Sequence, residues 1–335
     1  MIKIGIIGVG HLGKIHISCL QQIEEIELVG FYDTNPTTIK EVVDKYHIPY
    51  YDTYQSLIAA CDAIDIVTPT ISHYQLAMQA MNLGKHVFLE KPITATIPEA
   101  EEIVKYAQEH RLKVQVGHVE RFNDAYLNAK PFFKTPLFVE AHRLAEFNPR
   151  GTDVSVVLDL MIHDIDIVLS LIPYSVVEVS ANGVAVVSHS PDIANARLTF
   201  SNGATANLTA SRIAMKKMRK MRLFQPNAYI TMDFVEKKAD IMHLRDYQPS
   251  DDNDLFPLIV DLGENKGKKR IFIESPVSQN VNAIKMELSL FAKSIATDIP
   301  CVVSAEDGSK ALQIAYRIME SMEEQARIVK QYLDK

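Results

Sequence analysis

Cysteine is scarce in this chain of 335 residues, which contains three of them, Cys19, Cys61 and Cys301. They lie far apart, so they match none of the short spacings with which cysteines bind a metal ion. Their odd number and isolation also exclude a disulfide framework of the kind found in small secreted domains. We therefore expect a reducing compartment, and we predict a cytoplasmic protein with no metal site.

Long apolar runs and an excess of positive charge are absent as well. No run approaches the roughly 20 apolar residues of a transmembrane helix, and the first residues resemble a strand more than a signal peptide. With 35 Lys and Arg against 42 Asp and Glu, the net charge is −7. An acidic chain of this kind is not suited to general binding of nucleic acid. We expect neither a membrane nor a nucleic acid as a partner.

What the chain does contain is a glycine-rich turn near its start. An apolar run, 4–7, meets Gly8, Gly10 and Gly13 in G-x-G-x-x-G spacing, and a helical pattern follows. A strand that enters a helix through such a turn is typical of a dinucleotide site. Gly8 permits the tight turn, Gly10 lets the pyrophosphate approach the backbone, and Gly13 lets the helix lie close to the strand. The N-terminus of the helix offers free N–H groups to the phosphates.

An acidic residue at the end of the next strand indicates which dinucleotide binds. Residues 27–32 read as a strand, and Asp33 follows it, twenty residues after Gly13. An acid at this position accepts hydrogen bonds from the adenosine ribose hydroxyls. Because its charge repels the 2′-phosphate of NADP, we predict NAD as the cofactor. Asp33 is also suited to cap the helix that starts near Pro36.

The first third of the chain alternates strands and helices. The pattern predicts further helices at about 36–46, 56–60, 72–83 and 97–110, and further strands at 63–67, 86–89 and 113–116. This alternation predicts a doubly wound parallel sheet, a Rossmann domain, whose ligands bind at the carboxyl edge. The candidate cofactor ligands are Gly8, Gly10, His11, Leu12, Gly13, Asp33, Thr68, Pro69, His73, Glu90 and Lys91.

From about residue 117 the pattern changes. Strand-like runs appear at 137–143, 176–187, 194–200, 204–211, 229–234 and 269–274, with helices at 154–171, 281–297 and 306–332. The Ser201-Asn202-Gly203 turn joins two of the strands as a hairpin. The predicted fold class is therefore α/β, with a Rossmann domain at 1–120 followed by an α+β domain at 121–335. We expect the second domain to have an open, mostly antiparallel sheet and to bind both the substrate and other subunits.

The first stretch with candidate chemistry is Glu90-Lys91-Pro92, at the carboxyl edge of the predicted parallel sheet. A lysine beside a nicotinamide can hold a substrate hydroxyl and stabilise its developing negative charge. The alternative is a solvated surface lysine.

The second stretch is the apolar helix 156–169. Asp159 and His163 are four residues apart and share one face, and Asp166 follows on the same stripe. Burying ionisable groups among Val, Leu, Ile and Met costs several kcal/mol unless they are paired or functional. A histidine oriented by an aspartate is a common general base. The alternative is a structural pair.

Other polar residues lie near the predicted domain junction at 117–123. They are suited either to bind a substrate or to tie the junction together by ion pairs. Arg143 and Arg150 precede the apolar helix and are suited to grip a diphosphate. The cation-rich run 215–222 reads as a solvated edge strand or as a phosphate site. The candidate substrate ligands are Lys91, His118, Arg121, Asn123, Arg143, Arg150, Asp159 and His163.

Several motifs together resemble the Gfo/Idh/MocA oxidoreductases. They are G-V-G-H-L-G-x-x-H, the aspartate after the second strand, T-P-T-x-x-H ending at His73, G-K-H-V-F-L-E-K-P, D-L-M-I-H-D-I-D, and the closing run 300–312. The resemblance implies that Lys91 is the catalytic lysine, His163 the acid/base and Asp159 its partner. It also implies that the substrate is a sugar, a cyclitol or a nucleotide-linked sugar, and that the chain forms a homodimer or homotetramer.

Two motifs resemble one branch of the family, which oxidises the 3-hydroxyl of UDP-N-acetylglucosamine. They are G-H-V-E-R-F-N and D-L-M-I-H-D-I-D. We therefore expect an NAD-dependent oxidoreductase acting on a sugar hydroxyl, with a UDP-N-acetyl-hexosamine as the favoured substrate. A myo-inositol or free-sugar dehydrogenase remains an alternative. So does a regulator that binds a dinucleotide without catalysis, although such regulators would be expected to lack the lysine or the histidine.

Overall fold

The computed structural model describes residues 1–148, 154–253, 258–263 and 267–333. The chain divides into two compact units. Unit 1 comprises residues 1–122 with 282–314, and unit 2 comprises 123–281 with 315–335. In the described residues, no helix combines the length and the apolar character that are needed to cross a lipid bilayer.

Unit 1 is built on a parallel sheet in the strand order β2-β1-β3-β4-β5. Its elements are β1 (Ile2–Ile7), α1 (His11–Leu20), β2 (Ile26–Tyr32), α2 (Pro36–Tyr46), α3 (Tyr54–Ala60), β3 (Ala63–Ile66), η1 (Thr70–Ser72), α4 (His73–Asn82), β4 (His86–Glu90), α5 (Ile97–His110), β5 (Val114–Gly117), η2 (Val119–Phe122), α8 (Ala283–Thr297) and the first part of α9 (Ala305–Leu333). This confirms the Rossmann fold. The direction of strand addition reverses at β1, and ligands of such sheets bind at this switch point.

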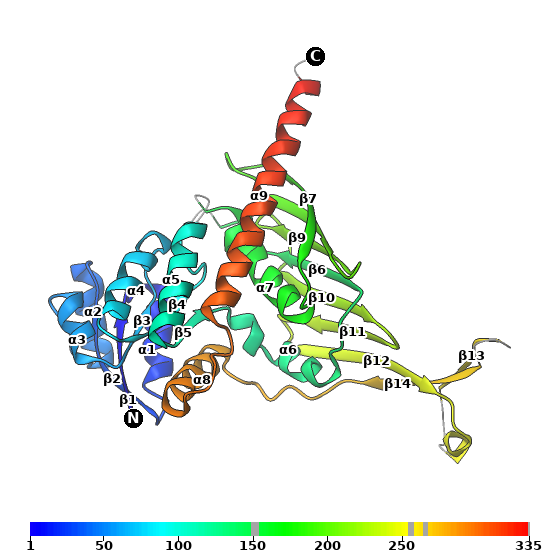
Figure 1. Ribbon diagram of the computed structural model, residues 1–335, viewed down its shortest axis with the longest axis horizontal. Helices are drawn as coiled ribbons and strands as arrows, with labels where there is room; N and C mark the ends of the chain where they lie inside the picture. The colour runs from blue at the N-terminus through cyan, green and yellow to red at the C-terminus, as the bar shows by residue number, and fades with distance from the viewer. Residues whose placement is uncertain (149–153, 254–257, 264–266, 334–335) are drawn as a thin grey trace. The chain divides into compact units, whose positions relative to one another are not determined.

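Helices cover both faces of this sheet. The helix α1 leads outward from β1 to β2, whereas α4 and α5 lead in the other direction. Because parallel crossovers are right-handed, these two sets lie on opposite faces. Helix α4 packs against α5, and α1 packs against α8 (Figure 1). The interior strands are apolar on both sides, and Ile4, Ile6 and Phe88 are fully buried.

Residues 282–314 return to unit 1, and 315–335 belong again to unit 2, which the sequence did not predict. The boundary predicted between residues 120 and 121 lies close to the crossing at 122, but residues 282–314 belong to unit 1 and not to the second domain. The reason is the apolar face of α8, where Leu288, Phe291 and Ala292 join a core cluster with residues of α1 and β4. Periodicity shows that a helix has an apolar face, but it does not show which sheet that face covers.

Unit 2 contains a sheet of nine strands in the order β13-β14-β12-β11-β10-β6-β9-β8-β7. Its elements are α6 (Asp124–Ala129), η3 (Lys130–Phe132), β6 (Phe138–Leu144), the π-helical turn η4 (Val157–Met161), α7 (Ile162–Leu171), β7 (Val176–Val184), β8 (Ile193–Phe200), β9 (Thr205–Ser211), β10 (Met218–Gln225), β11 (Ala228–Asp233), β12 (Lys238–Asp246), η5 (Pro249–Asn253), β13 (Ile259–Asp261), β14 (Lys268–Glu274) and the rest of α9. All neighbouring strands are antiparallel except β6 and β9. The predicted open, mostly antiparallel sheet is confirmed.

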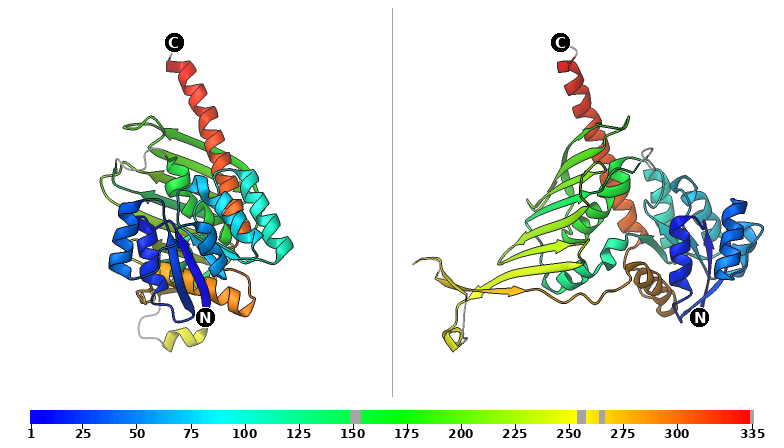
Figure 2. Two further views of the ribbon diagram at one scale, coloured as in Figure 1. Left: turned by 90° about the vertical axis from the view of Figure 1, so that its left-hand side faces the viewer. Right: turned by 180° about the vertical axis from the view of Figure 1, so that it is seen from behind.

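The two faces of the large sheet differ. Helices α6 and α7 lie on one face, and the C-terminal part of α9 runs along the edge strand β7, where Ser321 and Arg317 bond the backbone of Ala181 and Val176 (Figures 1 and 2). In the described residues no helix lies across the other face. Strand β6 reflects this, since Val139, Ala141 and Arg143 are buried while Glu140 and His142 alternate with them and are partly exposed.

The cation-rich run is part of this sheet, but not at its edge. Strand β10 lies between β11 and β6, so the interpretation of residues 215–222 as an edge strand is wrong. Two of its cations form ion pairs with acidic residues of the neighbouring strands. Lys220 lies 3.2 Å from Asp233 of β11, and Arg222 lies 2.8 Å from Glu140 of β6.

Candidate active site

The three glycines of the β1–α1 turn meet different surroundings. Gly8 has φ +88°, and a Cβ there would lie 2.8 Å from the Val67 carbonyl oxygen. A Cβ on Gly13 would lie 2.2 Å from the carbonyl oxygen of Gly8. At Gly10, by contrast, a Cβ would meet nothing within 4 Å. The fold itself therefore requires Gly8 and Gly13, whereas the absence of a side chain at Gly10 leaves open space beside the N-terminus of α1.

A cavity of about 400 Å³ opens at this turn. Five of the predicted cofactor ligands line it: Gly8, Gly10, Asp33, Thr68 and Pro69. His11 and Leu12 form the start of α1, where backbone N–H groups are free of intrahelical partners. The donor set fits a dinucleotide, because it combines a helix N-terminus for phosphates with a carboxylate for ribose hydroxyls.

Asp33 is tied to the glycine turn. Its Oδ2 atom accepts the N–H of Val9 at 2.8 Å, and its Oδ1 atom accepts the N–H of Asn35 at 2.8 Å. The helix α2 is capped by Asn35, which accepts from the N–H groups of Thr37 and Thr38. The alternative role of Asp33 as the helix cap is therefore wrong, and its carboxylate remains beside the cavity.

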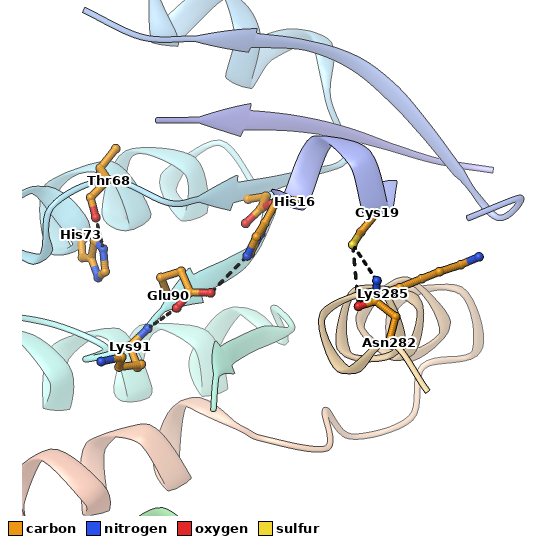
Figure 3. Close-up of polar contacts among 9 residues, drawn as sticks. His16, Cys19, Thr68, His73, Glu90, Lys91, Asn282 and Lys285 are labelled. Atoms are coloured by element: carbon orange, nitrogen blue, oxygen red, sulfur yellow. Dashed lines mark hydrogen bonds and ion pairs between the residues drawn. The ribbon is translucent and has the colours of Figure 1, made fainter. Parts of the chain in front are cut away.

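Lys91 follows directly after β4, at the carboxyl edge of the sheet. Its peptide bond to Pro92 is cis. The Oε2 atom of Glu90 accepts the backbone N–H of Lys91 at 3.1 Å (Figure 3). The backbone of Lys91 is thus held in this turn by the side chain of Glu90.

His73 contacts backbone atoms of the same edge. Its Nδ1 lies 2.9 Å from the carbonyl oxygen of Pro92. Its Nε2 lies 2.9 Å from the carbonyl oxygen of Thr68 (Figure 3). Burial lowers the pKa of His73, so the ring is neutral and donates to one of these carbonyls. His73 therefore links the loops that follow β3 and β4, and its role as a direct cofactor ligand stays a prediction.

Sequence reasoning missed a buried group behind the Lys91 turn. The Nδ1 atom of His16 lies 2.9 Å from Asp65, and its Nε2 atom lies 3.2 Å from Glu90. Burial alone would lower the pKa of His16, but the two carboxylates reverse this and raise its pKa well above the ordinary value. His16 stands in the ninth position of G-V-G-H-L-G-x-x-H, so the motif itself carried the signal.

The apolar helix of unit 2 differs from its prediction. It begins with the π-helical turn η4 and continues as α7, and such π-turns are frequent at functional sites. Asp159 lies on this turn and is exposed, and His163 is partly exposed. The prediction that Asp159 is buried among apolar residues is therefore wrong. The buried acids of this helix are Asp164 and Asp166.

Arg143 is the partner of one of these acids. Its Nε and Nη2 atoms donate to the two carboxylate oxygens of Asp164 at 3.0 and 2.8 Å. Both side chains are buried, with 2% and 6% of their surface exposed. Because this bidentate pair lies in the interior of unit 2, we no longer count Arg143 among the candidate substrate ligands.

The remaining predicted substrate ligands have the following surroundings. Asn123 caps α6 by accepting from the N–H of Ala125, and it donates to the carbonyl of Phe234. Arg121 lies 3.9 Å from Asp307, and His118 is buried. These contacts favour the structural alternative for Asn123 and Arg121. Arg150 lies outside the described residues.

Residues 2–118 match the model of the oxidoreductase family with an NAD-binding Rossmann fold, and residues 125–230 match that of the GFO/IDH/MocA C-terminal domain. The chain belongs to the Gfo/Idh/MocA family. It is therefore an oxidoreductase with an NAD-binding Rossmann domain, as the sequence motifs predicted.

Among members of the Gfo/Idh/MocA family, one curated relative is UDP-N-acetylglucosamine 3-dehydrogenase from Acidithiobacillus ferrooxidans. It is 40% identical over 72% of this chain and 77% of its own length. A solved structure of that enzyme, named GnnA, has a TM-score of 0.85 at 32% identity and covers 96% of this chain and 98% of its own.

A second solved structure shows the fold with a cofactor. It is scyllo-inositol dehydrogenase from Lactobacillus casei with bound NAD(H) and scyllo-inositol, with a TM-score of 0.77 at 23% identity. It covers 97% of this chain and 98% of its own.

Proposed function

We propose that this protein oxidises a sugar hydroxyl with NAD, and that the substrate is a UDP-N-acetyl-hexosamine oxidised at its 3-hydroxyl. The observation that carries the proposal is the similarity to GnnA over almost the whole chain, together with a lysine at the carboxyl edge of an NAD-binding sheet. NAD, when bound, accepts the hydride from the sugar carbon.

Lys91 supplies the polar contact to the reacting oxygen in this proposal. An ammonium group there hydrogen-bonds the substrate hydroxyl and stabilises negative charge that develops on it in the transition state. The fixed backbone of the Glu90–Lys91 turn favours this role, because a group held in place needs little reorganisation during the reaction.

His163 is the proposed acid/base. Its ring is partly exposed, and a neutral imidazole has a ring nitrogen that can accept a proton. As a base it accepts the proton of the sugar hydroxyl while the hydride leaves the carbon. Asp159, one turn earlier, is the proposed partner that orients the ring.

The substrate is tested by measuring NADH formation with UDP-N-acetylglucosamine, free N-acetylglucosamine, glucose and myo-inositol in parallel. We expect turnover with the nucleotide-linked sugar. Turnover of a free sugar or of inositol, with none of the UDP-sugar, would replace this proposal by the polyol dehydrogenase. An absence of turnover with all four, while NAD binds, would favour the non-catalytic regulator.

Lys91→Ala tests the role of the lysine. We expect turnover to fall by about 10²-fold or more, with the Kd for NAD unchanged. Lys105→Ala is the matched control, because Lys105 lies on α5 with 75% of its side chain exposed. A Lys91→Ala variant that keeps more than about a tenth of the activity would show that Lys91 is not catalytic.

A further inference from the structure

A network of ionisable side chains leads through the interior of unit 1 to the Glu90–Lys91 turn. The imidazole of His16 on α1 lies between Asp65 of β3, at 2.9 Å, and Glu90 of β4, at 3.2 Å. Glu90 in turn accepts the backbone N–H of Lys91. Figure 3 shows the part of this network that runs from His16 through Glu90 to Lys91.

Glu287 of α8 completes the network. Its side chain is fully buried, and neither carboxyl oxygen has a hydrogen-bond partner among the residues that the structure describes. One of these oxygens, an oxygen of Glu90 and a ring nitrogen of His16 all lie within 4.8 Å of one another. The backbone of Glu287 is held by the amide of Gln115 on β5, which donates to its carbonyl oxygen at 2.8 Å.

The charges of the cluster determine where its protons lie. His16 carries a positive charge, since Asp65 and Glu90 raise its pKa against the effect of burial. Burial raises the pKa of Glu90, but the hydrogen bond and charge of His16 outweigh this and lower it overall. Burial and the neighbouring Glu90 raise the pKa of Glu287 well above its ordinary value. Glu287 is therefore a neutral acid beside an ionised one.

We propose that Glu287 is a positioning residue for Lys91. Its protonated carboxyl group donates a hydrogen bond, directly or through one bridging water, to the carboxylate of Glu90, which holds the backbone of Lys91 at the end of β4. The inference rests on the proposed function, in which Lys91 contacts the substrate oxygen. A buried O–H beside a carboxylate is a strong, charge-assisted donor, and it satisfies a group that otherwise lacks a partner.

The surroundings of Glu287 identify what else could titrate with it. The groups that act on it electrostatically are Glu90, His16 and Asp65. The other elements packed against α8 carry Cys19 on α1, Glu120 and Arg121 on η2, and Lys3 on β1.

Two substitutions separate positioning from mere packing. Glu287→Met fills the space without a donor, and we expect kcat to fall about tenfold, as for a lost hydrogen bond to a charged group, with the Kd for NAD unchanged. Glu287→Gln keeps a neutral hydrogen-bond donor, so its kcat should stay close to that of the wild type. Glu109→Gln, at an exposed site on α5, is the control. A Glu287→Met variant with the kcat of the wild type would overturn the proposal.

The pH profile supplies a readout that packing would not change. Ionisation of Glu287 at alkaline pH places a second negative charge beside Glu90, so kcat of the wild type should fall there. Glu287→Gln cannot ionise, and we expect the ratio of its kcat to that of the wild type to rise with pH. A ratio that stays constant up to the pH at which the protein unfolds contradicts the proposal.

Stability and spectroscopy test the proton itself, without any substrate. The native state keeps a proton that the unfolded chain releases above about pH 4.5, so the free energy of unfolding of the wild type should decline with rising pH relative to Glu287→Gln. The infrared spectrum of the wild type minus that of Glu287→Gln should contain the C=O band of a protonated carboxylic acid at neutral pH. Absence of that band, or a stoichiometric metal ion lost in Glu287→Gln, overturns the assignment.

These measurements also distinguish the two proposals. If no sugar is oxidised, or if Lys91→Ala stays active, the proposed function fails while the infrared band still reports the protonation of Glu287. If Lys91→Ala is inactive and the band is absent, only the inference about Glu287 fails.

Discussion

Arg143 and Asp164 form a bidentate ion pair in the interior of unit 2, with 2% and 6% of their side chains exposed. Replacing Arg143 by Leu leaves the carboxylate of Asp164 buried without this cation, which we expect to destabilise the protein by about 3–5 kcal/mol in urea unfolding. Removing both charges together, as Arg143→Met with Asp164→Leu, should recover a large part of that loss.

A partly exposed ion pair between β6 and β10 is the control for this prediction. Arg222 and Glu140 lie 2.8 Å apart, but 45% and 31% of their side chains are exposed. Arg222→Ala should therefore change the free energy of unfolding by no more than about 1 kcal/mol. Equal losses for Arg143→Leu and Arg222→Ala would refute our account of the buried pair.

Asp33 determines the choice of dinucleotide at the residue scale. The wild type should bind NAD more tightly than NADP, since the carboxylate accepts ribose hydroxyls and repels a phosphate. Asp33→Asn keeps the oxygen that accepts from Val9 but removes the charge, so the preference should shrink about tenfold or more. Titration of each variant with both cofactors checks this, and a wild type that prefers NADP would contradict it.

The β1–α1 element allows the contributions of fold and ligand to be separated. Gly13→Ala places a methyl group 2.2 Å from a backbone oxygen, so it should destabilise the protein and push α1 away from β1. Gly10→Ala meets no protein atom within 4 Å, so its free energy of unfolding should stay close to that of the wild type.

In Gly10→Ala, the affinity for NAD should change although the free energy of unfolding does not. A methyl group on Gly10 occupies space that the pyrophosphate needs, and we expect the affinity for NAD to fall about tenfold or more although the fold is intact. Calorimetric titration with NAD, alongside urea unfolding, measures both quantities. Wild-type affinity in Gly10→Ala would show that the pyrophosphate does not approach the backbone at this residue.

At the scale of the whole molecule, the nine-stranded sheet predicts an assembly. On the face that α6 and α7 leave uncovered, a groove of about 520 Å³ is lined by residues that include Glu140, Asn195 and Arg197 of the sheet, and it is bordered by Gln325 of α9. We predict a homodimer or homotetramer that covers this face, in line with the family resemblance. Sedimentation of the wild type at micromolar concentration should give a multiple of 37.7 kDa.

A charge reversal on this face tests which surface is used. Arg197→Glu should weaken the assembly, whereas Lys105→Glu on the exposed side of α5 should not. A wild type that sediments as a single chain would rule out the assembly, and an intact assembly in Arg197→Glu would place the interface elsewhere.

The sequence by itself determined the features that depend on neighbours along the chain. The G-x-G-x-x-G turn, the acid after β2, the alternation of strands and helices and the Glu90-Lys91-Pro92 turn are local patterns, because backbone dihedrals and strand burial dictate them within a few residues. They were sufficient for the Rossmann fold, NAD and the family. The open antiparallel sheet was also predictable from the sequence. The hairpin turn at Gly203 and the alternation of apolar and polar residues along each strand are local patterns too.

Only the tertiary structure decided which distant charges meet. Arg143 and Asp164 lie 21 residues apart and pair because one side of β6 faces α7. Periodicity predicted that Asp159 is buried beside His163, but the π-helical turn leaves Asp159 exposed. Likewise, His16, Asp65, Glu90 and Glu287 come from four separate elements, and no spacing in the sequence connects them. Electrostatic partners are chosen by distance and burial in space, and a sequence pattern records neither.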